Sequence, residues 1–313
     1  MKNILITGGA GFIGSTLIRE LLKRENYKIF VLDIKENPIN LKSILGKIDY
    51  INGDIRNKEI VNSLFNSIDF AGVINFAAVS RVIWGHENPN LCVSTNIDGT
   101  KTLMDAISKS KKKSWVIFGS SREVYGEQTN LPVKESANKV PINIYGKTKL
   151  EGENIVINYS KKSGISSIIL RFSNVYGNER DILDRVIPNF VLRALRGENL
   201  EIHGGKQIFD FTHVDDTVQG IILAIEHLEK NDYALDDFHI LTGQPTKLID
   251  LPQIISKYIK KDVKIKFTKA RNYDVEKFYG DPSKAKDILG FNAKIDIDKG
   301  IEITVNRFKK MFV

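Results

Sequence analysis

A cluster of glycines near the N-terminus constrains the fold more than any other feature of the sequence. Gly8, Gly11 and Gly14 follow a short apolar run at residues 3–6 and open a stretch with helical periodicity. Between a strand and a helix, such glycines allow a tight turn, let the backbone approach a pyrophosphate, and let helix and strand pack closely. The helix N-terminus then offers N–H groups to phosphate oxygens. The segment therefore predicts a dinucleotide-binding turn that opens a parallel sheet.

An acidic residue closes the second expected strand. Asp33 lies nineteen residues after Gly14. A carboxylate there accepts hydrogen bonds from the ribose hydroxyls and repels a 2′-phosphate, so we expect NAD rather than NADP, in spite of the cation at Lys35. Asp54 follows the third expected strand, where it either reaches the adenine or caps the next helix.

Strand-like and helix-like runs alternate along the first half of the chain. This pattern predicts an α/β fold, a Rossmann-type doubly wound parallel sheet with helices on both faces. We expect strands at 3–6, 29–32, 49–51, 73–76, 115–118 and 168–172, with helices near 12–24, 57–67, 90–110 and 146–162. Beyond them, helices are expected at 185–196, 214–230 and 248–260, with short strands between. The expected NAD-binding Rossmann domain is 1–173, with 210–242 returning to it, and the smaller mixed C-terminal substrate-binding lobe is 174–209 and 243–313.

Composition excludes several classes of protein. The chain has 313 residues with a net charge of +8, and no apolar run long enough to cross a membrane. Its one cysteine, Cys92, cannot form an intramolecular disulfide and fits a reducing compartment, so we expect a cytoplasmic protein. The positive charge is scattered, and the lysine-rich run at 109–113 is expected to end a helix in solvent. We expect no nucleic-acid partner, no membrane and no metal.

A tyrosine and a lysine mark a candidate reaction site. Tyr145 and Lys149 are four residues apart in an expected helix, which places them on one face. A neighbouring ammonium favours the phenolate form of a tyrosine, and a phenolate beside a nicotinamide can remove an alcohol proton as a hydride leaves. Ser120 and Ser121 end the fifth expected strand, where a hydroxyl can bind the same oxygen. Either feature alone is common, but both lie at the carboxyl side of the expected sheet, where ligands bind.

With these motifs, the chain resembles the extended short-chain dehydrogenase/reductase family, in its nucleotide-sugar epimerase/dehydratase branch. The resemblance runs from Gly8 to the C-terminal helix. It is carried by Asp33 and by the segments 8–14, 75–78, 96–100, 120–126, 145–149, 170–177, 187–188, 194–197, 210–216 and 281–285.

The resemblance assigns roles to individual residues. It implies that Tyr145 is the base, Lys149 its partner, and Ser121 the hydroxyl that contacts the reacting oxygen. The positions that it implies for NAD are Gly8, Gly11, Phe12, Ile13, Gly14, Asp33, Asp54, Ile55, Ala77, Asn96, Tyr145 and Lys149. Those that it implies for a nucleotide-diphosphate sugar are Ser80, Asn174, His203 and Arg271. Asn174 and Arg271 are expected at the pyrophosphate, and His203 against the base. Arg271 and His203 also allow plainer interpretations, as a solvated loop residue and a strand-end residue. A homodimer through the helices near 90–110 and 146–162 is implied as well.

Two departures from the family pattern bear on the substrate. Phe209 stands where the family often has an arginine for the substrate phosphates, so phosphate binding must rest on Arg271 together with Arg185 or Lys206. Residues 84–86, Trp-Gly-His, replace the more usual small and acidic residues in the loop that borders the sugar. Both differences favour an unusual sugar nucleotide over UDP-glucose.

The residues after Ser121 bear on the reaction. Relatives that dehydrate their substrate carry an acid–base pair there, typically Asp-Glu, whereas this chain has Arg122 and Glu123. Because an arginine does not release a proton at neutral pH, dehydration is disfavoured. Glu123 keeps a decarboxylase or a 4,6-dehydratase open as an alternative, and it could equally form an ion pair with Arg122.

We therefore predict NAD-dependent oxidation at C4 of a nucleotide-diphosphate sugar, a hexose or a heptose. The enzyme would be a 4-epimerase or a 4-dehydrogenase in capsule polysaccharide biosynthesis, and its motifs are similar to those of UDP-hexose 4-epimerases and GDP-heptose 4-dehydrogenases. The alternative from another class is a catalytically silent NAD-binding scaffold, against which the intact Ser121, Tyr145 and Lys149 argue.

Overall fold

The computed structural model describes residues 1–271 and 275–312, and their contacts form two compact units. Unit 1 comprises Met1–Gly126, Asn138–Arg171 and Ile221–Phe238, and unit 2 comprises Glu127–Ala137, Phe172–Gly220 and His239–Val313. These bounds differ from those drawn from the sequence, since residues 127–137 and 210–220 group with unit 2. The cofactor-binding and substrate-binding roles expected of the two parts stay predictions.

Unit 1 is built on a seven-stranded parallel sheet with the strand order β10-β6-β5-β4-β1-β2-β3. This confirms the Rossmann-type doubly wound fold, and the order reverses between β1 and β4, which is where such sheets bind ligands. The six strands expected in the first half of the chain are present. The strands are β1 Lys2–Thr7, β2 Tyr27–Asp33, β3 Asp49–Asn52, β4 Gly72–Asn75, β5 Trp115–Ser121, β6 Ser167–Phe172 and β10 Leu235–Ile240.

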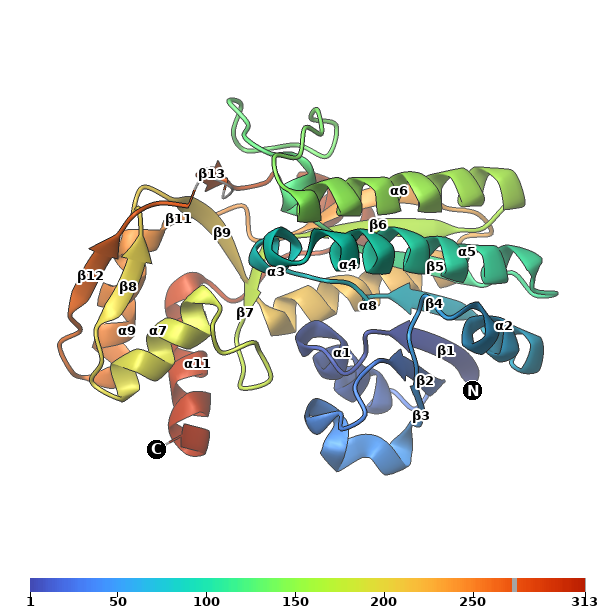
Figure 1. The fold of residues 1–313 in the computed structure, drawn as a ribbon, viewed down its shortest axis with the longest axis horizontal. Coiled ribbons are helices and arrows are strands. Elements are labelled where there is room, and N and C mark those ends of the chain that lie inside the picture. Colours follow the sequence, from blue (N-terminus) through green and yellow to red (C-terminus); the bar gives the residue numbers. More distant parts are fainter. Residues whose placement is uncertain (272–274, 313) are drawn as a thin grey trace. The chain divides into compact units, whose positions relative to one another are not determined.

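Helices cover both faces of this sheet, and Figure 1 shows α5 in front of it and α8 behind. The longer helices are α1 Phe12–Leu22, α2 Lys58–Ser67, α5 Gly99–Lys109, α6 Ile144–Ser163 and α8 Val214–Lys230. The shorter ones are η1 Ile39–Lys47, α3 Val82–Glu87, α4 Pro89–Val93, η2 Ser94–Asp98 and η3 Arg122–Val124. The helix expected at 90–110 is thus α4 and α5 joined by a π-helical turn, and α5 ends in the lysine-rich run as predicted.

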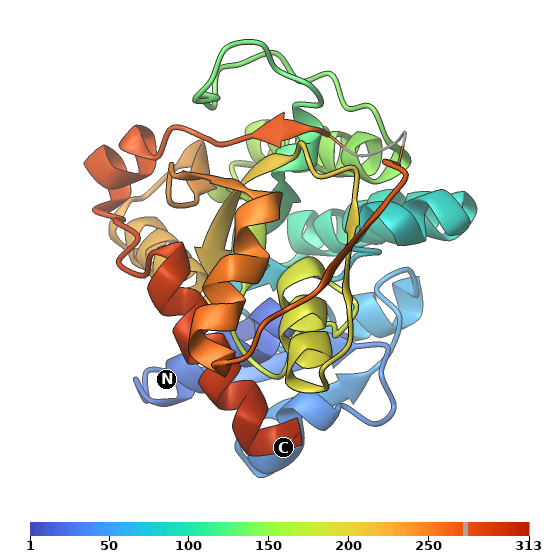
Figure 2. The same cartoon turned by 90° about the vertical axis from the view of Figure 1, so that its left-hand side faces the viewer.

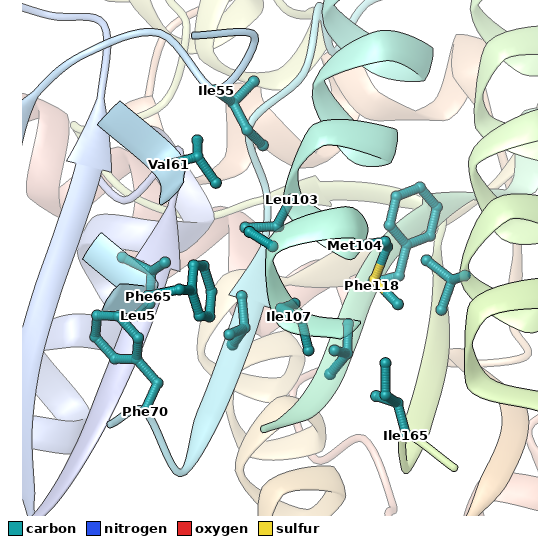
Figure 3. Close-up of a cluster of buried hydrophobic side chains, with 14 of the residues drawn as sticks. Leu5, Ile55, Val61, Phe65, Phe70, Leu103, Met104, Ile107, Phe118 and Ile165 are labelled. Atoms are coloured by element: carbon teal, nitrogen blue, oxygen red, sulfur yellow. The ribbon is translucent and has the colours of Figure 1, made fainter. Parts of the chain in front are cut away.

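A core of buried apolar side chains joins the sheet to α2, α5 and α6 (Figure 3). Phe70 is its aromatic centre, with edge-to-face contacts to Phe30 at 5.4 Å and to Phe65 at 5.3 Å between ring centroids. Leu103 and Phe118 extend the cluster along α5 and β5. Truncating a buried phenylalanine to alanine costs about 3–5 kcal/mol, so Phe70→Ala would weaken this face severely.

Unit 2 pairs short strands with a helical layer. Strands β11, β9 and β13 form a sheet, β7 pairs with β9, and β12 pairs with β8, which gives the expected smaller mixed lobe. Helices α7, α9 and α11 pack side by side, seen in yellow, orange and red in Figure 2. The bounds are β7 Asn174–Tyr176, α7 Val186–Leu195, β8 Leu200–His203, β9 Ile208–His213, β11 Pro245–Lys247, η4 Leu248–Asp250, α9 Leu251–Ile259, β12 Ile265–Thr268, β13 Lys277–Phe278, α10 Ser283–Leu289 and α11 Ile297–Phe312. Among the described residues, no helix is long and apolar enough to span a bilayer.

Candidate active site

The glycine turn between β1 and α1 is packed too tightly for side chains. Gly8 has a φ of 68°, and a Cβ on it would lie 2.6 Å from the backbone nitrogen of Ala77. A Cβ on Gly14 would lie 2.7 Å from the Cα of Gly9. Gly11 is the N-cap of α1 and provides no capping side chain, so the helix begins with N–H groups suited to an anion. Phe12 and Ile13 form that first turn.

Asp33 ends β2 beside this turn with its carboxylate fixed by the backbone. Its Oδ2 accepts from the N–H of Ala10 at 2.9 Å, and its Oδ1 accepts from the N–H of Lys35 at 3.1 Å. A carboxylate offers about four acceptor positions, so two bonds leave capacity for ribose hydroxyls. The Lys35 ammonium donates to the carbonyl of Ala10 at 3.4 Å.

Asp54 is not a helix cap, which corrects one of its two expected roles. The cap of α2 is Asn57, whose side chain accepts from the N–H groups of Glu59 and Ile60. Asp54 instead accepts a hydrogen bond from the Arg56 guanidinium, with 2.6 Å between its Oδ2 and Nη2 of Arg56. This bond lowers the pKa of the Asp54 carboxyl. Ile55 is buried next to it.

Asn96 bridges two segments of the candidate site. Its Oδ1 accepts from the N–H of Val79 at 2.8 Å, and its Nδ2 donates to the Val79 carbonyl at 3.1 Å and to the Thr148 hydroxyl at 2.8 Å. It thereby fastens the loop after β4, which holds Ala77 and the exposed Ser80, to α6. A part in cofactor binding stays a prediction for Asn96, Ala77 and Ile55.

Helix α6 presents Tyr145 and Lys149 on one buried face. The Lys149 ammonium donates to the carbonyl of Gly119 at 2.8 Å and lies 5.1 Å from the centroid of the Phe118 ring. Burial lowers the pKa of Lys149 to about 8, against the opposing influence of Cys92 and Glu153. Because Gly119 belongs to β5, this bond joins the helix of Tyr145 to the strand that ends at Ser121.

The structure distinguishes the two serines at the end of β5. The Ser120 hydroxyl donates to Oε1 of Glu153 at 2.6 Å, inside a buried network in which Arg171 binds both Glu153 oxygens at 2.8 Å. The Ser121 hydroxyl accepts from the N–H of Glu123 at 3.2 Å. Ser120 is therefore part of the scaffold, which leaves Ser121 as the candidate for a bound oxygen.

Glu123 forms the ion pair that the sequence left open. Its Oε1 lies 2.9 Å from Nη2 of Arg122, and its Oε2 accepts from Nδ2 of Asn143 at 2.7 Å. Asn143 also caps α6, accepting from the N–H of Gly146 at 2.8 Å. Asn143 is not among the residues predicted from the sequence, although an N-cap residue just ahead of the helix with Tyr145 is a recognisable signal.

The residues expected to bind substrate in unit 2 lie on separate elements. Asn174 begins β7 and donates to the Asp210 carbonyl at 3.3 Å, and His203 ends β8 with its Nδ1 2.7 Å from the Thr268 hydroxyl. Arg271 is exposed, and the rest of its motif, residues 272–274, lies outside the described residues. Phe209 is half-buried on β9.

Among the described residues, neither a cavity nor a cluster of metal-ligating side chains adds chemistry at the predicted positions. A hollow of about 480 Å³ in unit 2 is lined by Gly205, Lys206, Ile208, Lys247, Glu276 and Lys277, and of the residues considered for the substrate it holds only Lys206. Over 1–271 and 275–312, no three His, Cys, Asp or Glu side chains gather as a metal site. Arg185, the other candidate for a phosphate, pairs with Asp181 at 3.3 Å.

Comparisons with known proteins agree with this architecture. The family described as GDP-mannose 4,6 dehydratase matches residues 5–304. A putative UDP-glucose 4-epimerase of Methanocaldococcus jannaschii is 34% identical over 98% of each chain. UDP-glucuronic acid decarboxylase 6 of Arabidopsis thaliana is 30% identical over 98% of this chain and 88% of that protein.

Solved structures give the same result. The UDP-glucose 4-epimerase of Thermotoga maritima with UDP-glucose superposes with a TM-score of 0.92 at 29% identity, over 99% of this chain and 100% of the other. The UDP-glucuronic acid 4-epimerase of Bacillus cereus in complex with UDP-glucuronic acid and NAD has a TM-score of 0.90 at 28% identity and the same coverage. The chain therefore belongs to the extended short-chain dehydrogenase/reductase family of nucleotide-sugar epimerases and dehydratases.

Proposed function

We propose that this protein is an NAD-dependent nucleotide-sugar 4-epimerase, which oxidises C4 of a sugar nucleotide and returns the hydride to the same carbon. The observation that carries the proposal is the bond from Lys149 to the Gly119 carbonyl. It joins the helix of Tyr145 to the strand that ends at Ser121, so the three groups needed for oxidation of an alcohol come from elements in contact.

The glycine turn and Asp33 fit NAD. The turn excludes side chains at Gly8 and Gly14, and α1 begins without a capping side chain, which suits a pyrophosphate. The carboxylate of Asp33 suits the ribose hydroxyls and opposes a 2′-phosphate. Bound NAD supplies an acceptor and donor for the hydride. Several structural relatives, such as the Bacillus cereus epimerase, were solved with NAD.

In this proposal the protein itself handles the proton. Tyr145 takes the proton of the C4 hydroxyl, and the Lys149 ammonium favours the phenolate that does so. Ser121 holds the same oxygen with its hydroxyl. On the return step the same groups give the proton back, which needs no further acid.

Epimerisation is favoured over dehydration and decarboxylation by the groups after Ser121. Arg122 cannot protonate a leaving hydroxyl at neutral pH. Both oxygens of Glu123 are engaged by protein groups, which argues against its use as a base. The second candidate is a 4-dehydrogenase that releases the keto sugar. For either reaction, Phe209 in place of an arginine supports a nucleotide or sugar other than UDP-glucose.

We propose that the enzyme is a homodimer through the surface of α4, α5 and α6. Leu91 on α4 is 47% exposed and Val93 is 37% exposed, so two apolar side chains lie on that surface. Light scattering is expected to give a dimer for the wild type and a monomer for Leu91→Asp with Val93→Asp. A wild-type monomer would refute this part.

We further propose that the enzyme works in the cytoplasm and supplies sugars for capsule polysaccharide. The single cysteine supports a reducing compartment. Deleting the gene should remove one sugar from the surface polysaccharide and leave the soluble fraction without this activity.

The activity itself is tested on a panel of UDP-, GDP- and dTDP-sugars, with products followed by NMR. The wild type is expected to interconvert one C4 epimer pair, and Tyr145→Phe is expected to be slower by on the order of a thousandfold. Turnover of no sugar nucleotide, together with tight NAD binding, would favour the silent scaffold.

A further inference from the structure

The turn after Ser121 must stay in place relative to α6, because Ser121 and Tyr145 are proposed to bind the same oxygen. The chain between them does not hold them together locally, because Glu127–Ala137 belongs to unit 2 whereas the flanking segments belong to unit 1. Some contact within unit 1 must therefore fix Ser121 against the helix that carries Tyr145.

Glu123 and Asn143 make that contact. One side-chain bond of 2.7 Å joins them, and each is anchored to its own segment. On the strand side, the N–H of Glu123 donates to the Ser121 hydroxyl at 3.2 Å. On the helix side, Oδ1 of Asn143 caps α6 at the N–H of Gly146, one residue after Tyr145.

The backbones of the two segments also pack closely against each other. A Cβ on Gly146 would lie 2.4 Å from the carbonyl oxygen of Glu123. The first turn of α6 thus rests directly on the backbone of the Ser121 turn. The residues Glu123 and Asn143 are 5% and 7% exposed, so water competes little for their hydrogen bond.

Arg122 completes the arrangement. Its guanidinium lies 2.9 Å from the Glu123 oxygen that Asn143 does not use. The arginine gives the buried carboxylate a partner of opposite charge, and an unpaired buried charge would be strongly unfavourable. Both residues of the Arg-Glu pair that replaces the usual acid–base pair thereby take part in one clamp.

We propose that Glu123 is a positioning residue whose carboxylate, bonded to Asn143 and paired with Arg122, clamps the Ser121 turn to the start of the Tyr145 helix. The proposal rests on the proposed function, because positioning matters only if Ser121 and Tyr145 act on one substrate oxygen. It assigns Glu123 no proton transfer, in contrast to a decarboxylase or dehydratase.

Three variants separate positioning from proton transfer. Glu123→Gln keeps an oxygen for the Asn143 amide, loses the charge that pairs with Arg122, and cannot act as a base. Glu123→Ala removes the clamp. Asn143→Ser keeps a good helix cap and loses the amide donor that reaches Glu123. Glu59→Gln, at an exposed glutamate of α2 away from the proposed dimer surface, is the matched control.

We expect Glu123→Gln to lower kcat less than about tenfold and to keep the wild-type pH profile, because its hydrogen bond survives. Glu123→Ala and Asn143→Ser should each lower kcat by a larger factor with little change in KM. The double variant Glu123→Ala with Asn143→Ser should be no slower than the slower of the two single variants, because both substitutions break the same hydrogen bond. Glu59→Gln should match the wild type.

A second readout needs no substrate or cofactor. Hydrogen exchange at the amides of Gly146 and Lys147 should be faster in Glu123→Ala than in Glu123→Gln or the wild type. If the wild type turns over no sugar nucleotide, the proposed function fails, and this exchange still tests the clamp. The clamp is overturned if amide exchange is unchanged in Glu123→Ala. It is also overturned if the kcat of Glu123→Gln is as low as that of Glu123→Ala and its pH profile loses one limb, because that loss marks a proton-transferring group.

Discussion

Lys149 in unit 1 and Asp210 in unit 2 are both buried charged groups, and the two are held in different ways. In unit 1, the Lys149 ammonium makes one hydrogen bond among the described residues, to the Gly119 carbonyl. In unit 2, the Asp210 carboxylate accepts four, from the N–H and hydroxyl of Thr242, the N–H of Gly243 and the hydroxyl of Thr212.

This difference is the one expected between a charge that is available to a ligand and a charge that holds the fold together. Asp210 is the centre of a completed network that ties β9 to the segment after β10. Lys149 has donors to spare, as expected of a group that is kept for a ligand. Both charges are unfavourable in the folded state at neutral pH, because burial lowers the pKa of Lys149 to about 8 and raises that of Asp210 to about 6.

The largest expected effect comes from removing the lysine. Lys149→Met should lower turnover by on the order of a thousandfold, because the tyrosine loses the charge that favours its phenolate. The same variant should be more stable than the wild type at pH 7 by about 2 kcal/mol. Removing the buried charge raises the free energy of unfolding by about 3 kcal/mol, as the pKa shift implies. Loss of the hydrogen bond to Gly119 lowers it by about 1 kcal/mol.

The pH dependence of that gain follows from the direction of the shift. Below pH 8 the folded state holds a charged, buried Lys149, so the gain of Lys149→Met is complete. Between about 8 and 10.5 the folded wild type loses the proton first, and the gain fades. Urea unfolding at several pH values measures it, and a variant less stable than the wild type at pH 7 would contradict this account of Lys149.

The next effect concerns Asp210, with the opposite pH dependence. Because its pKa is raised to about 6, the wild type should gain up to about 3 kcal/mol of stability as the pH falls from 6 toward 4. Asp210→Asn should lack that gain and stay within about 1 kcal/mol of the wild type at pH 7, since relief of the buried charge offsets a lost acceptor for Gly243. Parallel pH curves for the two proteins would rule this out.

A smaller effect is expected at the cofactor. Asp33→Asn keeps the shape of the side chain and removes its charge. NAD should bind about tenfold more weakly, which is about 1.4 kcal/mol, and NADP should bind more tightly than to the wild type. Fluorescence titration with both cofactors checks this, and an unchanged NAD to NADP ratio would show that Asp33 does not select the cofactor.

The smallest effect is expected in unit 2. Phe209→Arg introduces the residue that the family often carries at this position, so KM for a UDP-sugar should fall a few-fold with kcat nearly unchanged. Phe209→Leu is the control for lost packing against Phe211, whose ring centroid lies 6.3 Å away. A lower kcat with unchanged KM would place position 209 outside phosphate binding.

The candidate site of unit 1 could be proposed from the sequence because its signals are local. The glycine turn, Asp33 and the Tyr145–Lys149 pair each lie within one strand–turn–helix unit or one helix, so spacing alone places them. The clamp between Glu123 and Asn143 joins residues twenty positions apart across a segment of the other unit, and no spacing rule reveals such a contact. In unit 2 the strands are short and Arg271 ends the described range, so the substrate residues remain predictions.

The most direct test of the central claim follows the hydrogen at C4. The sugar nucleotide that the wild type converts in the panel of UDP-, GDP- and dTDP-sugars is prepared with deuterium at C4. It is incubated with wild-type protein and with Tyr145→Phe, and the products are examined by NMR. The account predicts an epimer that retains deuterium at C4 and no exchange at C5, with Tyr145→Phe slower by on the order of a thousandfold. Solvent hydrogen at C5, release of carbon dioxide, or equal rates for the two proteins would contradict it.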